Sequence, residues 1–498
     1  MLNRHTCTAV AALAVIAVAL SPLSAGAQNR GLVPDDFYRE IGVGEVAISP
    51  DGALVAFTVT TIDEDANRRH REIWMQELSG GQPSGDPFRF TDPTREASAP
   101  VWSPDSRLLS FQSPRGETAS DATADSNPTW FARVTFPGGE AFQIEGVDRA
   151  PVWSPDDQWI AFLKRPHDAT DGVATERQGW IAPDAITNTL SAERFDGRVI
   201  TTMTYKRDGT LTLLPHPSTP AKRQLFIVPA AGGPAVQRTD LAFDVGELVW
   251  SPDAQRLYFT GDALEDDEYS DELTTDIYVI DRETGDPSTL TSNPGDELSP
   301  HVSPDGTALT FLHTRARGEE TDVRVVDLTA DGRVRGLPRT LTSDWPFVPG
   351  APTWAPTGDA VRFLAGVRGN RHLYEVTATG DLIRQVTSGD RDVQSLSASS
   401  DGLVMAYSAS DVVTPAEVFV NRRDGSGQRP VTSFNEEWLA EVSLQPAEKL
   451  AWTLTDGSQV EGWLIKPVGY EAGRQYPMIL KIHGGPYGAY RNTFFRTF

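Results

Sequence analysis

Short apolar stretches alternate with polar turns along most of the chain, and one phrase introduces them repeatedly. An apolar strand, often ending in Val-Trp, runs into Ser-Pro-Asp, and a second alternating strand follows. Proline presets φ at the second turn position, and Asp or Gly is favoured beside it, so the phrase predicts a hairpin between two strands. Seven turns occupy the same place in the repeat, namely Ser49, Ser103, Ser154, Ser251, Ser303, Ala355 and Ser399.

A second, weaker phrase follows each copy of the first. It consists of an alternating strand, a Gly- or Asp-rich turn and a short strand that ends near threonine, as in residues 276–291 and 372–387. Two hairpins in a period of about 50 residues make four antiparallel strands, which is one blade of a β-propeller. The turn aspartates are predicted to accept hydrogen bonds from nearby backbone amides rather than to bind metal.

Seven copies of the phrase predict seven blades. The spacing of 97 residues between Ser154 and Ser251 is about twice the others and leaves room for an eighth blade near residue 200. The alternative is a long insertion in the third blade, with residues 201–205 supplying its missing strand. The polar stretch at residues 166–198 then predicts a loop or short helix over one face.

Charge and composition exclude several classes of function. The 498 residues include 44 basic and 69 acidic side chains, a formal net charge of -25. Nucleic-acid binding needs a concentrated basic surface, so no nucleic-acid partner is expected, and anionic membrane surfaces are disfavoured. Cys7 is the single cysteine, which excludes disulfides and thiolate metal sites from the rest of the chain.

Residues 1–27 have the pattern of a signal peptide. Arg4 and His5 precede an unbroken apolar run at residues 9–20, and Ala25-Gly26-Ala27 offers a small-x-small cleavage site. Twelve apolar residues are too few for a helix to span a bilayer. We therefore expect an exported bacterial protein, periplasmic or secreted, whose mature chain has no membrane span.

The repeat ends after Phe434, and a different pattern begins. Residues 449–455 and 459–466 alternate as two strands around an Asp456-Gly457 turn. Residues 478–482 are mostly apolar and predict a buried strand. That run leads directly into His483-Gly484-Gly485-Pro486.

A strand followed by His-Gly-Gly-Pro resembles the oxyanion loop of the α/β-hydrolase fold. With the upstream repeat, the chain resembles the prolyl oligopeptidase family, in the branch of the acylaminoacyl-peptidases and bacterial dipeptidyl-peptidases. The phrase Asp456-Gly457, Gly462-Trp463-Leu464 and the pair Tyr476-Pro477 are also typical of that family. The expected fold is mostly β: a signal peptide (1–27), a seven-bladed propeller (28–436), and the first strands of an incomplete α/β-hydrolase domain (437–498).

The resemblance implies a serine peptidase that hydrolyses short peptides without metal or organic cofactor, and whose propeller restricts access. Glycines let backbone N–H donors approach a developing oxyanion, and the resemblance places one donor at Gly484-Gly485. By the same resemblance, His483 is expected to shape the loop and is not the triad histidine. The simpler alternative is that Gly484-Gly485-Pro486 forms an ordinary turn after a core strand. No serine has glycine at both second-neighbour positions, so the triad Ser, Asp and His is expected beyond Phe498. The 498 residues, read as a fragment or truncated frame, are expected to be inactive.

Other interpretations stay open. A non-catalytic periplasmic propeller that binds a partner, of the Tol-system type, would keep the blades without the chemistry. Glu436-Glu437 could hold a peptide amino terminus, although a surface helix or linker is favoured. The acidic stretch at residues 265–268 with Asp271 and Glu272 lacks the regular spacing of a calcium loop and predicts a solvated insertion.

Overall fold

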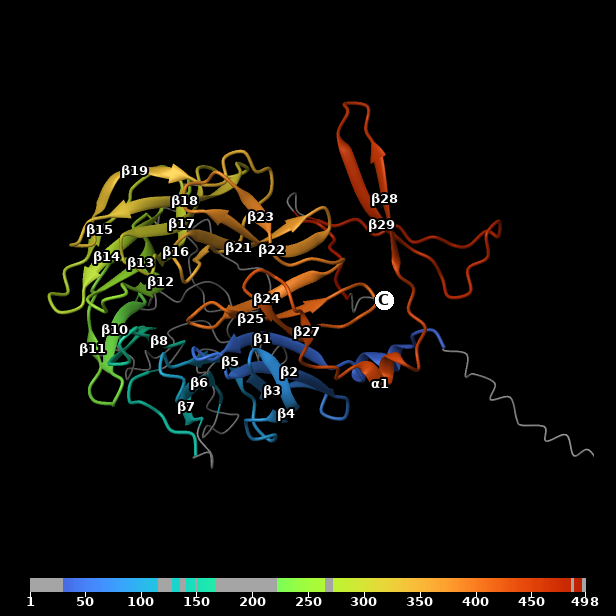
Figure 1. Ribbon diagram of the computed structural model, residues 1–498, viewed down its shortest axis with the longest axis horizontal. Helices are drawn as coiled ribbons and strands as arrows, with labels where there is room; N and C mark the ends of the chain where they lie inside the picture. Colours follow the sequence, from blue (N-terminus) through green and yellow to red (C-terminus); the bar gives the residue numbers. More distant parts are fainter. Residues whose placement is uncertain are drawn as a thin grey trace, which may run out of the picture.

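The computed structural model describes residues 30–114, 128–134, 140–147, 150–166, 222–264, 272–484 and 488–494. Within them, seven β-sheets follow one another in chain order around a ring, which is a seven-bladed β-propeller (Figure 1). Each of these blades is an antiparallel meander, and a single parallel bridge between Arg371 and Asp392 links the sheets of blades six and seven. The predicted propeller is confirmed. The predicted signal peptide lies outside the described residues.

The strands are short, and the second strand of most blades is buried on both faces along most of its length. In blades one to three they are β1 (Gly42–Ile48), β2 (Leu54–Asp63), β3 (Arg68–Ser79), β4 (Gln82–Arg89); β5 (Ser98–Trp102), β6 (Leu108–Gln112), β7 (Thr129–Arg133); β8 (Val152–Trp153), β9 (Trp159–Lys164), β10 (Gln224–Pro229) and β11 (Val236–Gln237). In blades four and five they are β12 (Val245–Trp250), β13 (Arg256–Asp262), β14 (Thr275–Asp281), β15 (Ser288–Thr289); β16 (Asp296–Val302), β17 (Ala308–Thr314), β18 (Thr321–Leu328) and β19 (Val334–Thr340). In blades six and seven they are β20 (Thr353–Trp354), β21 (Ala360–Val367), β22 (Asn370–Thr377), β23 (Ile383–Gln385); β24 (Asp392–Ala398), β25 (Val404–Ser410), β26 (Glu417–Arg422) and β27 (Arg429–Pro430).

The repeated serine and aspartate close the turn between the first two strands of a blade. Ser49 Oγ donates to Asp51 Oδ1 at 2.6 Å and accepts the N–H of Leu54 at 2.9 Å. The same Oδ1 accepts the N–H of Ala53 at 3.0 Å. Equivalent serine–aspartate bonds form in five further turns: Ser103–Asp105, Ser154–Asp156, Ser251–Asp253, Ser303–Asp305 and Ser399–Asp401. The predicted architectural role of these aspartates is confirmed.

The residue after the turn aspartate has a left-handed backbone. Gly306 has φ +73°, a conformation that costs other residues about 1–2 kcal/mol. In blades two and three, Ser106 and Asp157 replace the glycine with φ of +62° and +59°. Each adds a hydrogen bond between blades: Ser106 Oγ accepts the N–H of Asp51, and Asp157 Oδ1 accepts that of Asp105, both at 3.1 Å. These bonds offset the backbone strain.

A tryptophan before the turn links blades two, four and six to the preceding blade. Trp102 Nε1 donates to the carbonyl of Ala47 at 2.9 Å, and Trp354 Nε1 donates to that of His301 at 3.1 Å. The acceptor lies two residues before the turn position of the preceding blade. A buried indole N–H needs a partner, so this bond explains why tryptophan recurs at the end of the first strand.

The threonine that ends the second phrase has a matching role at the outer strands. Thr239 Oγ1 accepts the N–H of Leu225 at 2.9 Å and donates to Gln224 Oε1 at 2.8 Å. Thr342 Oγ1 accepts from Val323 and donates to Asp322 in the same way. The hydroxyl thus satisfies a backbone donor that lies beyond the end of the fourth strand.

The long spacing in the third blade is an insertion rather than an eighth blade. β9 pairs directly with β10, and β8 to β11 form a complete four-stranded sheet. Residues 201–205 were predicted to supply one of these strands, and that prediction is wrong because Gln224–Pro229 forms the strand instead. Residues 201–205 themselves lie outside the described part of the chain. Nearly all of the predicted loop at 166–198 also lies outside it. Trp250 of blade four bonds to blade three without an intervening sheet. Seven is therefore the number of blades in the described ring.

Blades one and seven close the ring without exchanging a strand. The N–H groups of Val46 and Ile48 donate to Ser395 Oγ and Ser397 Oγ at 3.0 and 3.1 Å. One apolar cluster joins both blades, with Phe57 from blade one packed beside Val418 from blade seven. The N–H of Ser400 also donates to the carbonyl of Pro50 at 2.9 Å, so side chains and this backbone bond close the ring, and the two blades share no sheet.

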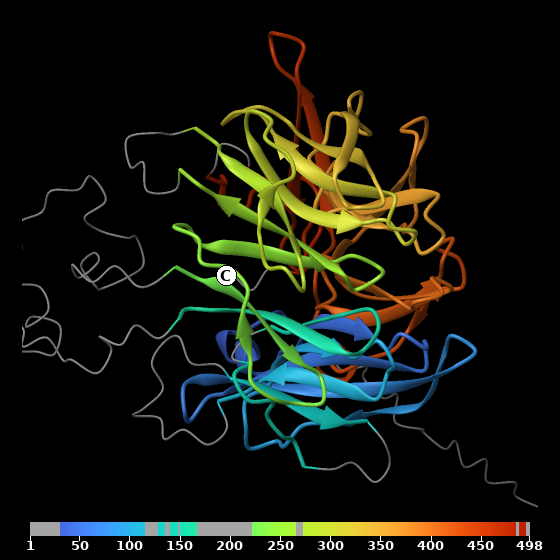
Figure 2. The ribbon, with the colours of Figure 1, turned by 90° about the vertical axis from the view of Figure 1, so that its left-hand side faces the viewer.

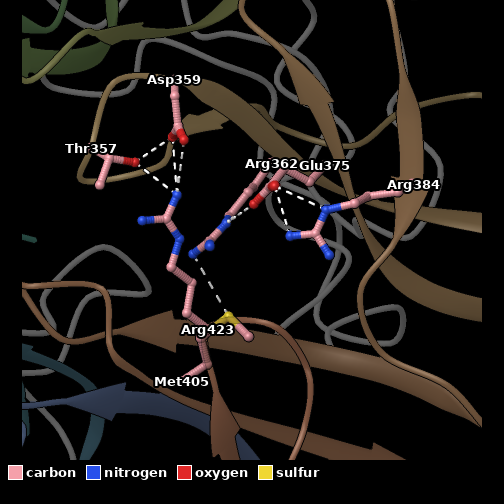
Figure 3. A network of polar contacts seen from close by, with 7 residues as sticks. All are labelled: Thr357, Asp359, Arg362, Glu375, Arg384, Met405 and Arg423. Carbon is pink, nitrogen blue, oxygen red and sulfur yellow. Dashed lines mark hydrogen bonds and ion pairs between the residues drawn. The ribbon is translucent and has the colours of Figure 1, made fainter.

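A polar network joins blades six and seven (Figure 3). Arg362 is buried and donates from Nε to Glu375 Oε2 at 2.9 Å, while Arg384 pairs with the other oxygen of Glu375. Arg362 also approaches the sulfur of Met405 in blade seven. Near the turns, Arg423 of blade seven donates to Asp359 of blade six at 3.0 Å.

The two ends of the propeller meet beside blade one. Helical segments η1 (Pro34–Tyr38) and α1 (Glu436–Leu439) lie together, with Trp438 Nε1 donating to Asp36 Oδ1 at 3.0 Å. Arg30 pairs with the same carboxylate at 2.6 Å and holds the pKa of Asp36 well below its usual range. No helix in the described residues is long and apolar enough to cross a membrane.

Candidate active-site segment

The segment after the propeller begins with the predicted hairpin. β28 (Ala447–Thr453) pairs with β29 (Gln459–Ile465) in antiparallel register, and it projects from the ring in both views (Figure 2). Gly457 has φ +89° in the turn, and its N–H donates to the carbonyl of Leu454 at 3.0 Å. The hairpin and its Asp-Gly turn are confirmed.

Trp463 attaches this hairpin to blade six. Its ring packs on Gly369, where an added Cβ would lie 2.5 Å from the Trp463 ring. Lys449 Nζ donates to the carbonyl of Arg368 on the same blade. The family-type phrase around Gly462-Trp463 therefore places an indole at the junction with the propeller.

Residues 478–482 were predicted to form a buried strand, and that prediction is wrong for this structure. They form no strand, and the side chains of Met478 and Ile479 are 77% and 94% exposed. A strand needs a hydrogen-bonded neighbour, and no described strand lies beside this run. The apolar side chains of this run therefore form an exposed surface.

The glycine loop follows directly. His483 Nδ1 lies 3.0 Å from the carbonyl oxygen of Gly484, a bond made when that nitrogen carries hydrogen. A Cβ added at Gly484 would meet no atom within 4 Å, so the space beside its backbone is open. Gly485 and Pro486 lie outside the described residues, and the role predicted for each residue of this loop stays a prediction.

Tyr490, which follows the glycine loop in the chain, packs against His483. Its ring meets the His483 imidazole edge-to-face, with centroids 5.6 Å apart. Its carbonyl accepts the indole N–H of Trp463 at 3.2 Å. A continuous series of contacts therefore runs from Gly369 of blade six through Trp463 and Tyr490 to His483.

Residues 488–494 return to the ring and contact blades six and seven. Asn492 is buried: its N–H donates to the carbonyl of Gly369 at 2.7 Å, and its Oδ1 accepts the N–H of Val412 at 3.2 Å. Thr493 Oγ1 lies 2.8 Å from Ser410 Oγ. The sequence carried no signal for this docking, because no repeat or family phrase covers these residues.

An ion pair strengthens the same contact. Arg491 Nε lies 2.8 Å from Asp392 Oδ1, and the Asp392 side chain is buried. Burial raises the pKa of the Asp392 carboxyl, and the charges of Arg491 and Arg371 oppose that shift. The C-terminal segment is thus held on the propeller by one buried amide and one buried carboxylate.

The other candidate residues do not gather into a site. Glu436 and Glu437 are exposed on α1, which is the surface helix that the sequence favoured. Of the predicted acidic stretch, only Glu272 lies in the described part. In that part of the chain, no group of three or more His, Cys, Asp or Glu side chains could hold a metal ion.

Comparison with known proteins gives consistent relatives. The chain is 26% identical over 503 residues to dipeptidyl-peptidase 5 of Porphyromonas gingivalis, covering 97% of this chain and 68% of that protein. It is 25% identical to an uncharacterized peptidase of Bacillus subtilis, covering 94% of this chain and 68% of the relative. No protein-family model matches the chain.

Solved structures show the same fold. An acylaminoacyl peptidase in complex with Z-Gly-Gly-Phe-chloromethyl ketone matches with a TM-score of 0.64 and 14% identity, covering 92% of this chain and 63% of that one. The acylaminoacyl peptidase of Pyrococcus horikoshii matches with a TM-score of 0.62 at 15% identity and with the same coverage. The chain therefore spans about two thirds of the length of the proteins that it matches.

Proposed function

We propose that the chain is a member of the prolyl oligopeptidase family of serine peptidases, and that it supplies the propeller and the oxyanion loop of an enzyme that hydrolyses short peptides. The observation that carries this proposal is the open glycine loop at His483-Gly484, directly beside the propeller junction. Similarity to the peptidases of this family supports the proposed reaction, which is acyl transfer through a serine nucleophile.

In this reaction, the serine oxygen attacks the scissile carbonyl and its proton passes to the histidine of the triad. The carbonyl oxygen becomes negatively charged and is stabilised by backbone N–H donors. We assign one donor to the Gly484-Gly485 turn and a loop-shaping role to His483. The triad is placed outside these 498 residues, so the 498-residue chain alone is proposed to be inactive.

A substitution pair at Gly484 tests the oxyanion assignment in the polypeptide expressed from the complete gene. Gly484→Pro removes the N–H and should lower kcat for a short chromogenic peptide by about 10²–10³-fold with little change in KM. Gly484→Ala keeps the N–H, and its Cβ meets no atom within 4 Å in this structure, so its activity should fall much less than that of Gly484→Pro. Equal loss in both variants would contradict the assignment.

The serine mechanism has its own test. The polypeptide expressed from the complete gene should be labelled by a fluorophosphonate, and the labelled serine should lie in a Gly-x-Ser-x-Gly elbow. If the gene encodes no such elbow, the peptidase proposal fails and a non-catalytic propeller becomes the better description.

Restricted access is the proposed role of the ring. The described blades close without a missing neighbour, and a closed propeller beside the loop would admit short or unfolded peptides more readily than folded proteins. The enzyme should cleave a short peptide and leave the same sequence intact within a folded domain. Equal rates on both would argue against gating.

Export is proposed from the leader pattern at residues 1–27. Mass spectrometry of the protein from its host should find Gln28 at the amino terminus in the periplasmic or external fraction. Replacing Ala25 and Ala27 by leucine should block this processing. An unprocessed wild-type protein in the cytoplasmic fraction would contradict the proposal.

A further inference from the structure

A hollow of about 680 Å³ opens on the face of the ring that carries the Ser-Pro-Asp turns. It lies where the turns of blades seven, one, two and three meet, and we name it the turn-face hollow. Its lining includes Pro50, Pro104, Pro155, Trp102, Trp153 and Ser400. We propose that this hollow docks a cationic peptide segment that also carries apolar side chains.

The lining favours apolar and aromatic contact. Among the residues named, Ser400 contributes the one hydroxyl, and its Oγ already donates to the carbonyl of Pro50 at 2.8 Å. Trp102 uses its indole N–H on the carbonyl of Ala47, so its ring remains an apolar surface. Pockets for small ligands commonly measure about 300–1,000 Å³ and are mostly apolar, which matches this hollow.

The rim is acidic. The four turns that border the hollow, residues 50–53, 104–107, 155–158 and 400–403, have six charged side chains: Asp51, Asp105, Asp156, Asp157, Asp401 and Arg107. The hydrogen bonds from the turn serines fix most of these carboxylates, as Ser399 fixes Asp401 and lowers its pKa. Clustered charge of one sign around an apolar opening attracts ligands of the opposite sign.

Charge complementarity therefore selects the occupant. Lysine or arginine side chains would face the carboxylates, while leucine or proline side chains would enter the hollow. A cation can also lie over an indole face, and two tryptophans line this hollow. An acidic or purely polar segment has neither advantage.

The turn-face hollow is separate from the candidate active-site segment. β24 begins at Asp392, which binds Arg491, and its seven residues lead to the turn that holds Ser400. Eight residue steps separate Asp392 from Ser400, so at about 3.3 Å per residue the two sites are roughly 25 Å apart along this strand. Docking at the hollow can therefore be measured by a binding assay that involves no peptide hydrolysis, so its failure and the failure of the proposed peptidase activity are distinguishable.

The test uses two end-blocked peptides with a fluorescent label, one alternating lysine with leucine and the other alternating glutamate with leucine. Anisotropy should show saturable binding of the lysine peptide, weakened about fivefold or more between ~20 and ~200 mM salt. The glutamate peptide should not bind. Equal binding of both peptides, or no binding of the lysine peptide at millimolar concentration, would overturn the proposal.

Matched variants separate the hollow from general surface charge. Asp51→Asn with Asp401→Asn keeps the turn acceptors and should weaken lysine-peptide binding by about fivefold. Asp253→Asn with Asp305→Asn makes the same change in turns that do not border the hollow, and should leave Kd within about twofold. Equal weakening by the two pairs would contradict docking at the hollow.

A second pair tests the apolar contact. Ser400→Phe places a ring at the opening and should abolish binding, while Pro304→Phe occupies the equivalent turn position of blade five and should not. Unchanged thermal unfolding of each variant shows that the ring remains folded. Retained binding in the Ser400→Phe variant would exclude the hollow as the docking site.

Discussion

Trp250 of the fourth blade donates its indole N–H to the carbonyl of Val152 in the third blade at 2.9 Å, 98 positions earlier in the chain. Blades one and two, and blades five and six, are joined by the same bond. In the described part of the chain, Trp153 is the exception: its N–H has no partner. Ser110 Oγ instead donates to the carbonyl of Val101, which is the equivalent acceptor.

This exception provides a matched test of the bond between blades. Trp250→Phe keeps most of the apolar ring but leaves the Val152 carbonyl without its donor, so it should cost about 1–3 kcal/mol in unfolding free energy. Trp153→Phe makes the same change where no such bond exists, and should cost less. Urea denaturation of both variants measures the difference, and equal losses would mean that the bond contributes little.

The repeat could be predicted because its causes are local. Ser49, Asp51 and Gly52 lie within four positions, so the turn that they form is visible in the sequence. The bond between Trp250 and Val152 joins residues that are far apart in the sequence, and no local sequence pattern indicates which carbonyl accepts it. The strand assigned to residues 201–205 was predicted wrongly for the same reason, since strand pairing across an insertion depends on the whole sheet.

The candidate site was predictable in part. The hairpin at Asp456-Gly457 follows from turn chemistry, whereas the apolar run at 478–482 shows only that burial is favourable and not which neighbour provides it. The docking of Asn492 depends on single hydrogen bonds to two blades, and these have no periodic pattern in the sequence.

The turn serine should have a measurable stabilising effect. Ser303 is buried, donates to Asp305 and accepts the N–H of Ala308, so Ser303→Ala should cost about 1–2 kcal/mol in unfolding free energy. The sixth blade has Ala355 at this place and Thr357 where the other turns have aspartate, so Ala355→Ser adds only the acceptor for a backbone N–H. Thermal denaturation should show Ser303→Ala destabilised and Ala355→Ser neutral or stabilised. An unchanged Tm for Ser303→Ala would contradict this role.

Asp276 should make the protein less stable as the pH rises. Burial, followed by the charges of Glu297 and Asp262, raises the pKa of its carboxyl to about 6. Because an unfolded aspartate titrates near 3.9, the native state binds this proton more tightly, and stability falls between about pH 4 and pH 6.

Asp276→Asn should therefore stabilise the protein at pH 8 by about 1–2 kcal/mol and have little effect at pH 4. Urea denaturation at both pH values checks this expectation. Asp65→Asn, in the exposed turn between β2 and β3, serves as the control and should change stability at neither pH. A destabilised Asp276→Asn variant at pH 8 would show that the charged form is needed.

Gly369→Ala should detach the hairpin β28–β29 from blade six. The new Cβ would lie 2.5 Å from the Trp463 ring, so the indole must move and its bond to the carbonyl of Tyr490 should break. Hydrogen exchange should become faster at the N–H of Asn492, which bonds to Gly369.

Gly469→Ala is the matched control, because Gly469 also has positive φ but no atom within 4 Å of an added Cβ. Both variants carry a backbone cost of about 1–2 kcal/mol. Faster exchange in both would attribute the effect to backbone strain, and unchanged exchange in Gly369→Ala would show that Trp463 does not hold the junction.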